Sequence, residues 1–207
     1  MDAVDAARRV AESVHRALVE KGADPWHLLD FVMQEASRRD IVVYGLPPDD
    51  PQLKGGQAVF DRQACAILYA DGGTDFDRAF LIAHELGHVA LEGGSEDVVT
   101  LHVEPDRSVE DAPVGIEKVL DYGARERREI RMDLFARELL LPRSVAVALH
   151  VRDGMSAAAI AERLRARTSM VQQQLLDALL LPPSPETDLA PPSSPPPAED
   201  PSQLDAA

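Results

Sequence analysis

The chain has 207 residues, a formal net charge of −15 and one cysteine. One cysteine excludes an intramolecular disulfide, and so acidic a surface repels phosphate backbones, so direct nucleic-acid binding is not expected. The first residues lack the basic and apolar parts of a secretory signal, and no apolar run approaches the roughly 18 residues that span a bilayer. The sequence therefore predicts a cytoplasmic protein without a membrane partner.

Two helices are expected first. Apolar residues recur at helical spacing between residues 4 and 18, which predicts an amphipathic helix. A second helix is expected from residue 25 to about residue 39, because Asp24 and Pro25 suit its N-cap and first position.

Strands are expected next. Residues 41–44 predict a strand that Gly45 and two prolines close, and residues 57–60 and 64–70 predict a hairpin around residues 61–63. We therefore expect a small antiparallel sheet. Cys65 would lie in its last strand as a buried, inert thiol.

Thr74 and Asp77 form the pattern of a capping box, which predicts a helix from about residue 75. Its middle reads His84-Glu85-Leu86-Gly87-His88, an H-E-x-x-H motif. Side chains four residues apart share a helix face, so both imidazoles can bind one cation. Glu85 can then act as general base on a water. The alternative is an ordinary pair of histidines beside a solvated glutamate.

A catalytic zinc usually takes three protein ligands and a water. The expected helix over residues 123–141 carries four acidic candidates, Glu126, Glu129, Asp133 and Glu138. Glu129 and Asp133 share a face, so one could bind the metal while the other accepts the N–H of a metal-binding imidazole.

Residues 80–88, FLIAHELGH, and residues 129–142, EIRMDLFARELLLP, together resemble the ImmA/IrrE family of gluzincin metallopeptidases over roughly residues 25 to 180. The second block of that family reads roughly E-x-x-A-[ND]-x-F-A-x-x-L-L-x-P. The resemblance implies that Glu129 is the third ligand, with Glu126 as the alternative, and leaves Asp133 to support an imidazole. Met132 replaces the usual alanine.

The resemblance also implies that an edge strand beside the metal helix pairs with extended substrate. Residues 65–69 are our candidate, and an ordinary core strand is the alternative. The acidic residues 92–121 predict either a solvated loop or a lid, with one strand-like piece at 98–103. His102 and Tyr122 could stabilise an oxyanion there, although packed or solvent-facing side chains are the default for both.

Residues 143–181 predict a helix-turn-helix pattern, with Ser156 as a cap, a turn at 166–168 and a helix from Ser169. A DNA-reading role would place residues 172–174, all glutamines, against adenine edges and use Arg163, Arg165 and Arg167 on phosphates. The net charge argues against it, so packing or partner docking is the expected role.

Residues 182–207 contain nine of the sixteen prolines and five acidic residues, with no lysine or arginine, which predicts a disordered linker. The last residues, QLDAA, resemble the opening of a UvrD-like helicase. The chain could therefore be the peptidase portion of a helicase-linked protein.

The sequence thus predicts an α+β protein: a mostly helical zincin-like metallopeptidase domain (1–142), a helix-turn-helix-like extension packed on it (143–181) and the tail (182–207). The predicted activity is endopeptidase cleavage of a regulatory protein, by resemblance a helix-turn-helix repressor. Zinc is the expected metal, with Mn²⁺ or iron as alternatives. The competing hypothesis is a metal-containing protein-binding or regulatory module of a larger helicase-linked protein with latent or no proteolysis.

Overall fold

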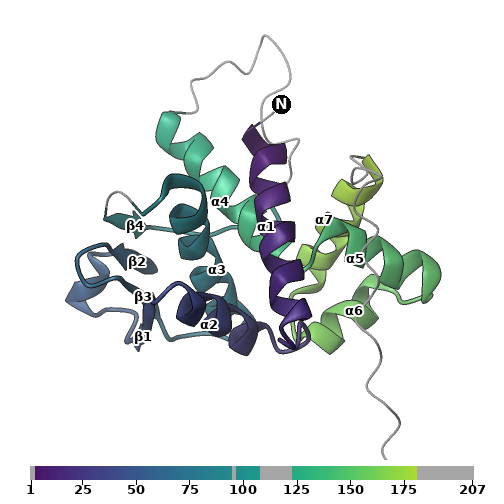
Figure 1. Cartoon of the computed structure of the whole chain (residues 1–207), viewed down its shortest axis with the longest axis horizontal. Coiled ribbons are helices and arrows are strands. Elements are labelled where there is room, and N and C mark those ends of the chain that lie inside the picture. The colour runs from purple at the N-terminus through teal and green to yellow at the C-terminus, as the bar shows by residue number, and fades with distance from the viewer. Residues whose placement is uncertain (1–2, 95–96, 108–122, 181–207) are drawn as a thin grey trace, which may run out of the picture.

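The computed structural model describes residues 3–94, 97–107 and 123–180. Tyr122, most of the expected lid and the proline-rich tail lie outside the described residues. Within the described ranges the chain is a mixture of helices and a small sheet (Figure 1). The elements are α1 (Ala3–Glu20), α2 (Leu28–Arg38), β1 (Val42–Leu46), η1 (Pro51–Leu53), β2 (Ala58–Asp61), β3 (Ala66–Ala70), α3 (Asp75–Glu92), β4 (Val98–Thr100), α4 (Ala124–Leu140), α5 (Arg143–Val147), the π-helical turn η4 (Ala148–Arg152), α6 (Ala157–Leu164) and α7 (Thr168–Leu180).

The sheet is mixed, with the strand order β1-β3-β2-β4. β2 pairs antiparallel with β3 and with β4, as the predicted hairpin requires, but β1 pairs parallel with β3. The prediction of a purely antiparallel sheet is therefore wrong. The physical reason is that β3 enters between β1 and β2, so that β1 never pairs with the strand that follows it in the chain.

The same order corrects the expected substrate strand. β3 is hydrogen-bonded on both sides, to β1 and to β2, so its backbone has no free edge for a peptide. Among the described strands, β1 and β4 form the edges of the sheet. The prediction that residues 65–69 bind substrate is therefore wrong.

Cys65 lies in the turn of the β2–β3 hairpin and not in a strand. Its φ is +49°, a left-handed conformation that few residues other than glycine adopt, and its side chain is exposed. The backbone N–H of Cys65 donates to the carbonyl of Arg62 to close this turn. The prediction of a buried thiol is therefore wrong.

α2 starts later than predicted. Asp24 does accept a backbone hydrogen bond, from Trp26, and its other carboxylate oxygen lies 2.8 Å from Nδ1 of His27. These contacts make a separate turn before the helix, which begins at Leu28.

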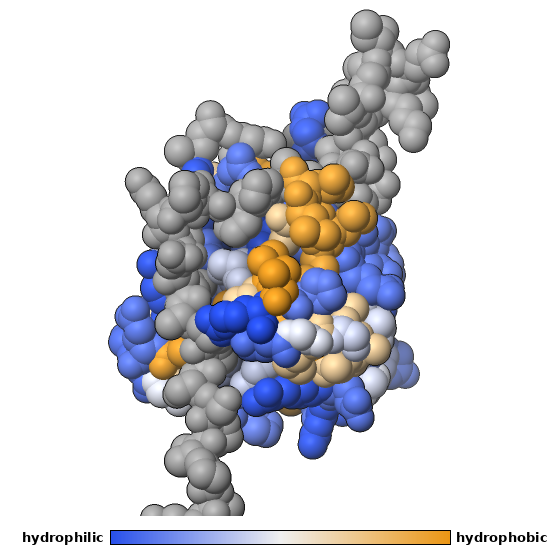
Figure 2. All heavy atoms as spheres, turned by 90° about the vertical axis from the view of Figure 1, so that its right-hand side faces the viewer, coloured by the Kyte–Doolittle hydropathy of each residue, from blue (hydrophilic) through white to orange (hydrophobic). Residues whose placement is uncertain are grey.

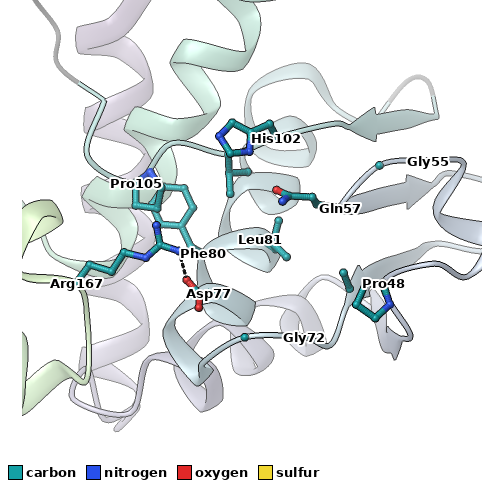
Figure 3. Close-up of a pocket in the computed structure, with 14 residues that line it drawn as sticks. Pro48, Gly55, Gln57, Gly72, Asp77, Phe80, Leu81, His102, Pro105 and Arg167 are labelled. Carbon is teal, nitrogen blue, oxygen red and sulfur yellow. Dashed lines mark hydrogen bonds and ion pairs between the residues drawn. The ribbon is translucent and has the colours of Figure 1, made fainter.

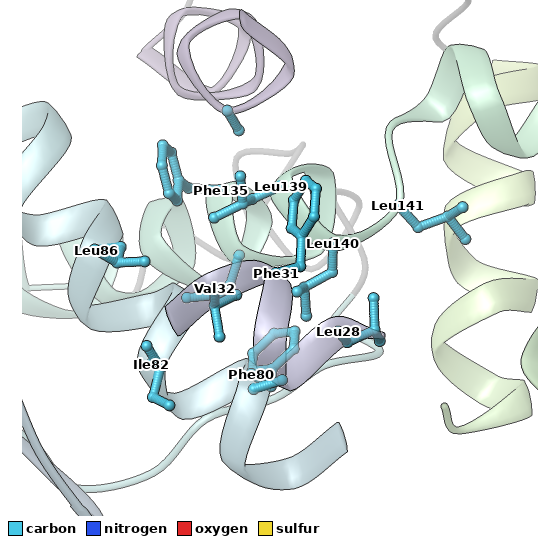
Figure 4. Packing of buried hydrophobic residues seen from close by; sticks show 14 of the residues in the cluster. Leu28, Phe31, Val32, Phe80, Ile82, Leu86, Phe135, Leu139, Leu140 and Leu141 are labelled. Atoms are coloured by element: carbon cyan, nitrogen blue, oxygen red, sulfur yellow. The ribbon is translucent and has the colours of Figure 1, made fainter. Parts of the chain in front are cut away.

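Helix α3 is the centre of the fold, because it packs against β2 and β3 on one side and against α2 and α4 on the other. α1 packs along α4, with the small buried residues Ala7 and Ala11 on its inner face. Figure 4 shows how α2, α3 and α4 meet in an apolar core that includes Phe31, Phe80 and Phe135. Sheet and helices thus hold α3 and α4 against each other.

Helices α5, α6 and α7 lie beside this core and share it, since Val145, Ile160 and Val171 belong to the same buried cluster as Phe31. Figure 2 views this side of the molecule and shows apolar side chains gathered on it. Leu176, Leu179 and Leu180 of α7 are among the exposed large apolar residues. None of the described helices has the length and apolar character needed to cross a membrane.

Candidate metal centre

The H-E-x-x-H motif lies in the middle of α3, as its spacing predicts. The predicted capping box starts the helix: the backbone N–H of Asp77 donates to the Thr74 hydroxyl at 3.2 Å, and the Thr74 N–H donates to the Asp77 carboxylate at 2.9 Å. α3 then continues without a break to Glu92. Gly87 lets α4 come close, because a Cβ at this position would lie 3.0 Å from Phe135 and 3.1 Å from the sulfur of Met132.

Three predicted ligands converge between α3 and α4. Nε2 of His84 lies 3.2 Å from Oε2 of Glu129, and Nε2 of His88 lies 3.9 Å from the same oxygen. One ligand atom from each residue lies within 4.8 Å of the other two. Such a group can hold a metal ion, and two imidazoles with a carboxylate suit zinc.

The other acidic candidates of α4 do not join this group. Glu126, three residues earlier, is exposed. Glu138 is buried elsewhere and accepts hydrogen bonds from the Gln174 amide and the Arg143 backbone. The placement agrees with the choice of Glu129 over Glu126.

The opposite nitrogen of each imidazole is bound by a carboxylate. Nδ1 of His84 lies 2.9 Å from Oδ1 of Asp133, which is the supporting contact expected for Asp133. Nδ1 of His88 lies 3.0 Å from Oε2 of Glu92. With Nδ1–H donating to a carboxylate, Nε2 of each ring carries the lone pair that a metal needs.

The protonation of the two rings differs. Burial lowers the pKa of His84, but hydrogen bonds with Asp133 and Glu129 outweigh it and raise that pKa to about 9. Burial lowers the pKa of His88 to about 4, and its Nε2 is buried without a hydrogen-bond partner among the described residues. Nε2 of His84 therefore shares a proton with Glu129, which a cation would have to displace before it could use the lone pair of that nitrogen, whereas the lone pair on Nε2 of His88 is already free of a proton.

Glu85 is fully buried, and neither of its carboxylate oxygens has a hydrogen-bond partner in the described part of the chain. Burial raises the pKa of Glu85 to about 7, although the neighbouring His84 and the nearby Thr100 hydroxyl, which itself has no hydrogen-bond partner among the described residues, lower it. An unpartnered buried carboxyl is costly, and it is the kind of group that functional sites retain.

Three supporting residues were not predicted. Glu92 ends α3 and binds Nδ1 of His88, and Arg128 of α4 donates to both of its carboxylate oxygens. Arg107 donates from its Nε to Oδ2 of Asp133 at 3.0 Å. Glu92 could have been found from its position one helical turn after His88. No local pattern indicates Arg107.

His102 is exposed and lies on a pocket of about 500 Å³ next to the N-terminal half of α3 (Figure 3). Phe80 and Leu81 of α3 and Gln57 line the same pocket, and the ion pair between Arg167 and Asp77 lies at one end of it. The three converging ligands do not line this pocket. The oxyanion role of His102 stays a prediction, and the corresponding one for Tyr122 falls outside the described residues.

Several of the residues that a DNA-reading role would need are engaged within the protein, whereas Arg165 and Gln172 are exposed. Gln174 is buried and bonds to Arg137, Glu138 and the Leu141 carbonyl. The guanidinium of Arg163 stacks 3.8 Å above the ring of Trp26, and Arg167 binds Asp77. These contacts favour the packing role of α6 and α7.

A comparison with protein families, with curated proteins and with solved structures found no match to this chain.

Proposed function

We propose that this protein is a metal-dependent endopeptidase in which His84, His88 and Glu129 bind zinc and Glu85 is the general base. The observation that carries the proposal is the unpartnered carboxyl of Glu85 beside three converging ligand atoms. A structural zinc is normally closed by four protein ligands, whereas a catalytic zinc has three. The described cluster comprises three residues, and Glu92 is not one of them, because its carboxylate binds Nδ1 of His88 and Arg128.

Zinc bound to these residues would supply Lewis-acid polarisation of a peptide carbonyl and of the attacking water. Glu85 takes the proton from that water and passes it to the leaving amine, which requires a carboxyl that can both gain and lose a proton near neutrality. Burial gives Glu85 this property, since its pKa is raised to about 7. Asp133 and Glu92 keep the two imidazoles in the ligand tautomer.

The substrate class rests on the resemblance to the ImmA/IrrE family, which implies a protein substrate, commonly a helix-turn-helix repressor. We propose such a repressor, cleaved in the cytoplasm in a stress response, and a fused or associated helicase as a further partner. Mn²⁺ is an alternative to zinc because the same ligands accept it. The competing hypothesis, a protein-binding module without turnover, would be favoured by a closed site with four protein ligands.

The decisive experiment uses Glu85→Gln, which removes the base and leaves the three ligands intact. We expect the variant to retain zinc and to lose proteolysis. Wild type and variant are incubated with repressors encoded beside the gene and with casein. Cleavage of a repressor by wild type alone supports the proposal. Vigorous casein cleavage refutes a selective regulator, and normal cleavage by Glu85→Gln refutes the mechanism.

A further inference from the structure

Asp133 connects the metal centre to a segment that precedes α4. Its Oδ1 bonds to Nδ1 of His84, while its Oδ2 accepts hydrogen bonds from Nε of Arg107 at 3.0 Å and from the backbone N–H of Glu104 at 3.3 Å. Asp133 is 1% exposed and Arg107 is 13% exposed, so little water competes for these contacts. A carboxylate that is bonded through both oxygens is held in one orientation, and the imidazole follows it.

The segment that carries Arg107 is itself bound by Arg137 of α4. Nη1 of Arg137 donates to the carbonyl of Arg107 at 2.6 Å and to that of Pro105 at 3.4 Å. Arg137 is 1% exposed, so these contacts replace its hydration entirely. The backbone on both sides of Asp106 is thereby fixed to the helix that also carries Glu129 and Asp133.

The other two nitrogen atoms of the Arg137 guanidinium bind α7. Nη2 of Arg137 donates to the carboxylate of Asp177, and Nε donates to the Gln174 side chain at 2.9 Å. Arg8 of α1 also donates to Asp177, at 2.8 Å. The two partners of such a buried ion pair stay together, because separating them would leave an uncompensated charge in the interior.

We propose that Arg107 is a positioning residue for the metal ligand His84, and that Arg137 and Asp177 hold Arg107 in place. Contacts then run from α7 through Arg137 and Arg107 to Asp133 and the imidazole. Helix α7, which sequence patterns assign to packing or partner docking, thereby sets the affinity of the metal centre. This inference rests on the metal centre of the proposed function, but not on proteolysis.

The test measures the zinc Kd by competition with a chromophoric chelator. Arg107→Met keeps most of the apolar stem and removes the guanidinium, and we expect it to weaken zinc binding by roughly 10- to 100-fold. Arg107→Lys should recover part of the loss. Arg167→Met is the matched control, because Arg167 also binds an aspartate, but that residue is Asp77 in the first turn of α3, away from the ligands. The control should leave the zinc Kd unchanged.

Two further measurements separate positioning from a general loss of structure. Asp133→Asn combined with Arg107→Met should be no worse than Asp133→Asn alone, since Arg107 acts through Asp133. In the zinc-loaded Glu85→Gln protein, the Nδ1–H proton resonance of His84 should shift on Arg107→Met and stay in place on Arg167→Met. Circular dichroism should show the same helix content for all these variants.

The outer part of the network is tested with Arg137→Lys, which keeps the positive charge opposite Asp177 but cannot reach both Asp177 and the Arg107 carbonyl. We expect weaker zinc binding at unchanged helix content. An unchanged zinc Kd in both Arg107→Met and Arg137→Lys, with a large loss in Asp133→Asn, would overturn the inference. Failure of the proposed function would look different: zinc binding would respond to these variants as described, while no substrate was cleaved.

Discussion

Oε2 of Glu92 lies 3.0 Å from Nδ1 of His88, and both residues belong to α3, four positions apart. The contact can therefore form within the helix itself, and Arg128 of α4 additionally binds the Glu92 carboxylate. Nδ1 of His84, by contrast, is bound by Asp133 from α4. One imidazole is oriented by its own helix and the other by the partner helix, so the two ligands should respond differently to mutation.

Glu92→Ala is predicted to weaken zinc binding by roughly 10- to 100-fold, because Nδ1 of His88 loses its acceptor and the ring is free to turn. Glu92→Gln should retain much of the affinity, since the amide oxygen can still accept the hydrogen bond. Zinc Kd values measured with a competing chelator check this. Equal losses in the two variants would show that the charge opposite Arg128 matters and the hydrogen bond does not.

Glu129→Ala should lose zinc during purification, because it removes one of three ligand atoms. Glu126→Ala is its control on the same helix and should keep zinc, because Glu126 is exposed. Elemental analysis of both purified proteins decides the matter. If the Glu126 variant lost zinc and the Glu129 variant kept it, the third ligand would be Glu126, and the assignment to Glu129 would be wrong.

Gly87→Ala should destabilise the protein, because the new methyl group would lie 3.0 Å from Phe135 and 3.1 Å from Met132. Overpacking costs about 1–3 kcal/mol, from which the higher helix propensity of alanine recovers up to about 1 kcal/mol. Met132→Ala should lower the free energy of unfolding less in the Gly87→Ala protein than in wild type, since the shorter side chain makes room for the new methyl group. Urea unfolding of wild type, the two single variants and the double variant measures this coupling. Additive changes in the free energy of unfolding would contradict it.

His15 predicts a pH dependence of stability. Burial lowers its pKa to about 4, against a smaller opposing effect of the hydrogen bond with the Leu139 carbonyl. Between about pH 6.5 and pH 4 the unfolded chain binds a proton that the folded protein does not. The free energy of unfolding therefore falls as the pH falls through this window, by roughly 3 kcal/mol for this residue.

The effect is measured as a difference between proteins. His15→Gln cannot take up the proton, so its free energy of unfolding should fall less between pH 8 and pH 4 than that of wild type. His150→Gln, at an exposed histidine, is the control and should follow wild type. Parallel curves for wild type and His15→Gln would show that His15 is protonated in the folded protein as well.

Features encoded within one or two helical turns could be predicted from the sequence. The capping box at Thr74 and the ligand pair His84 and His88 depend only on helix geometry, and α3 forms as that geometry requires. Glu129 could be ranked above Glu126 before the helices were placed together, through the resemblance to a family pattern. The assignment of Glu92 to the acidic segment 92–121 concealed its role, because α3 still includes it.

Features that depend on contacts between distant segments could not be predicted. The parallel pairing of β1 with β3 follows from the insertion of β3 between two strands, and local alternation of apolar residues carries no information on it. Arg107 lies 26 positions before Asp133, in a segment without regular secondary structure. The left-handed turn at Cys65 could not be predicted, because the apolar run of residues 64–70 does not indicate at which residue the strand begins.

The apolar core runs without interruption from Phe31 and Phe80 to Ile160 and Val171. The described helices before and after residue 142 share this core, which predicts that they unfold as one cooperative unit. Partial unfolding of α6 and α7 would expose the inner face of that core and leave the guanidiniums of Arg8 and Arg137 buried without Asp177. A single unfolding transition, in which the loss of α7 and the loss of the metal centre coincide, is the behaviour that such a core imposes.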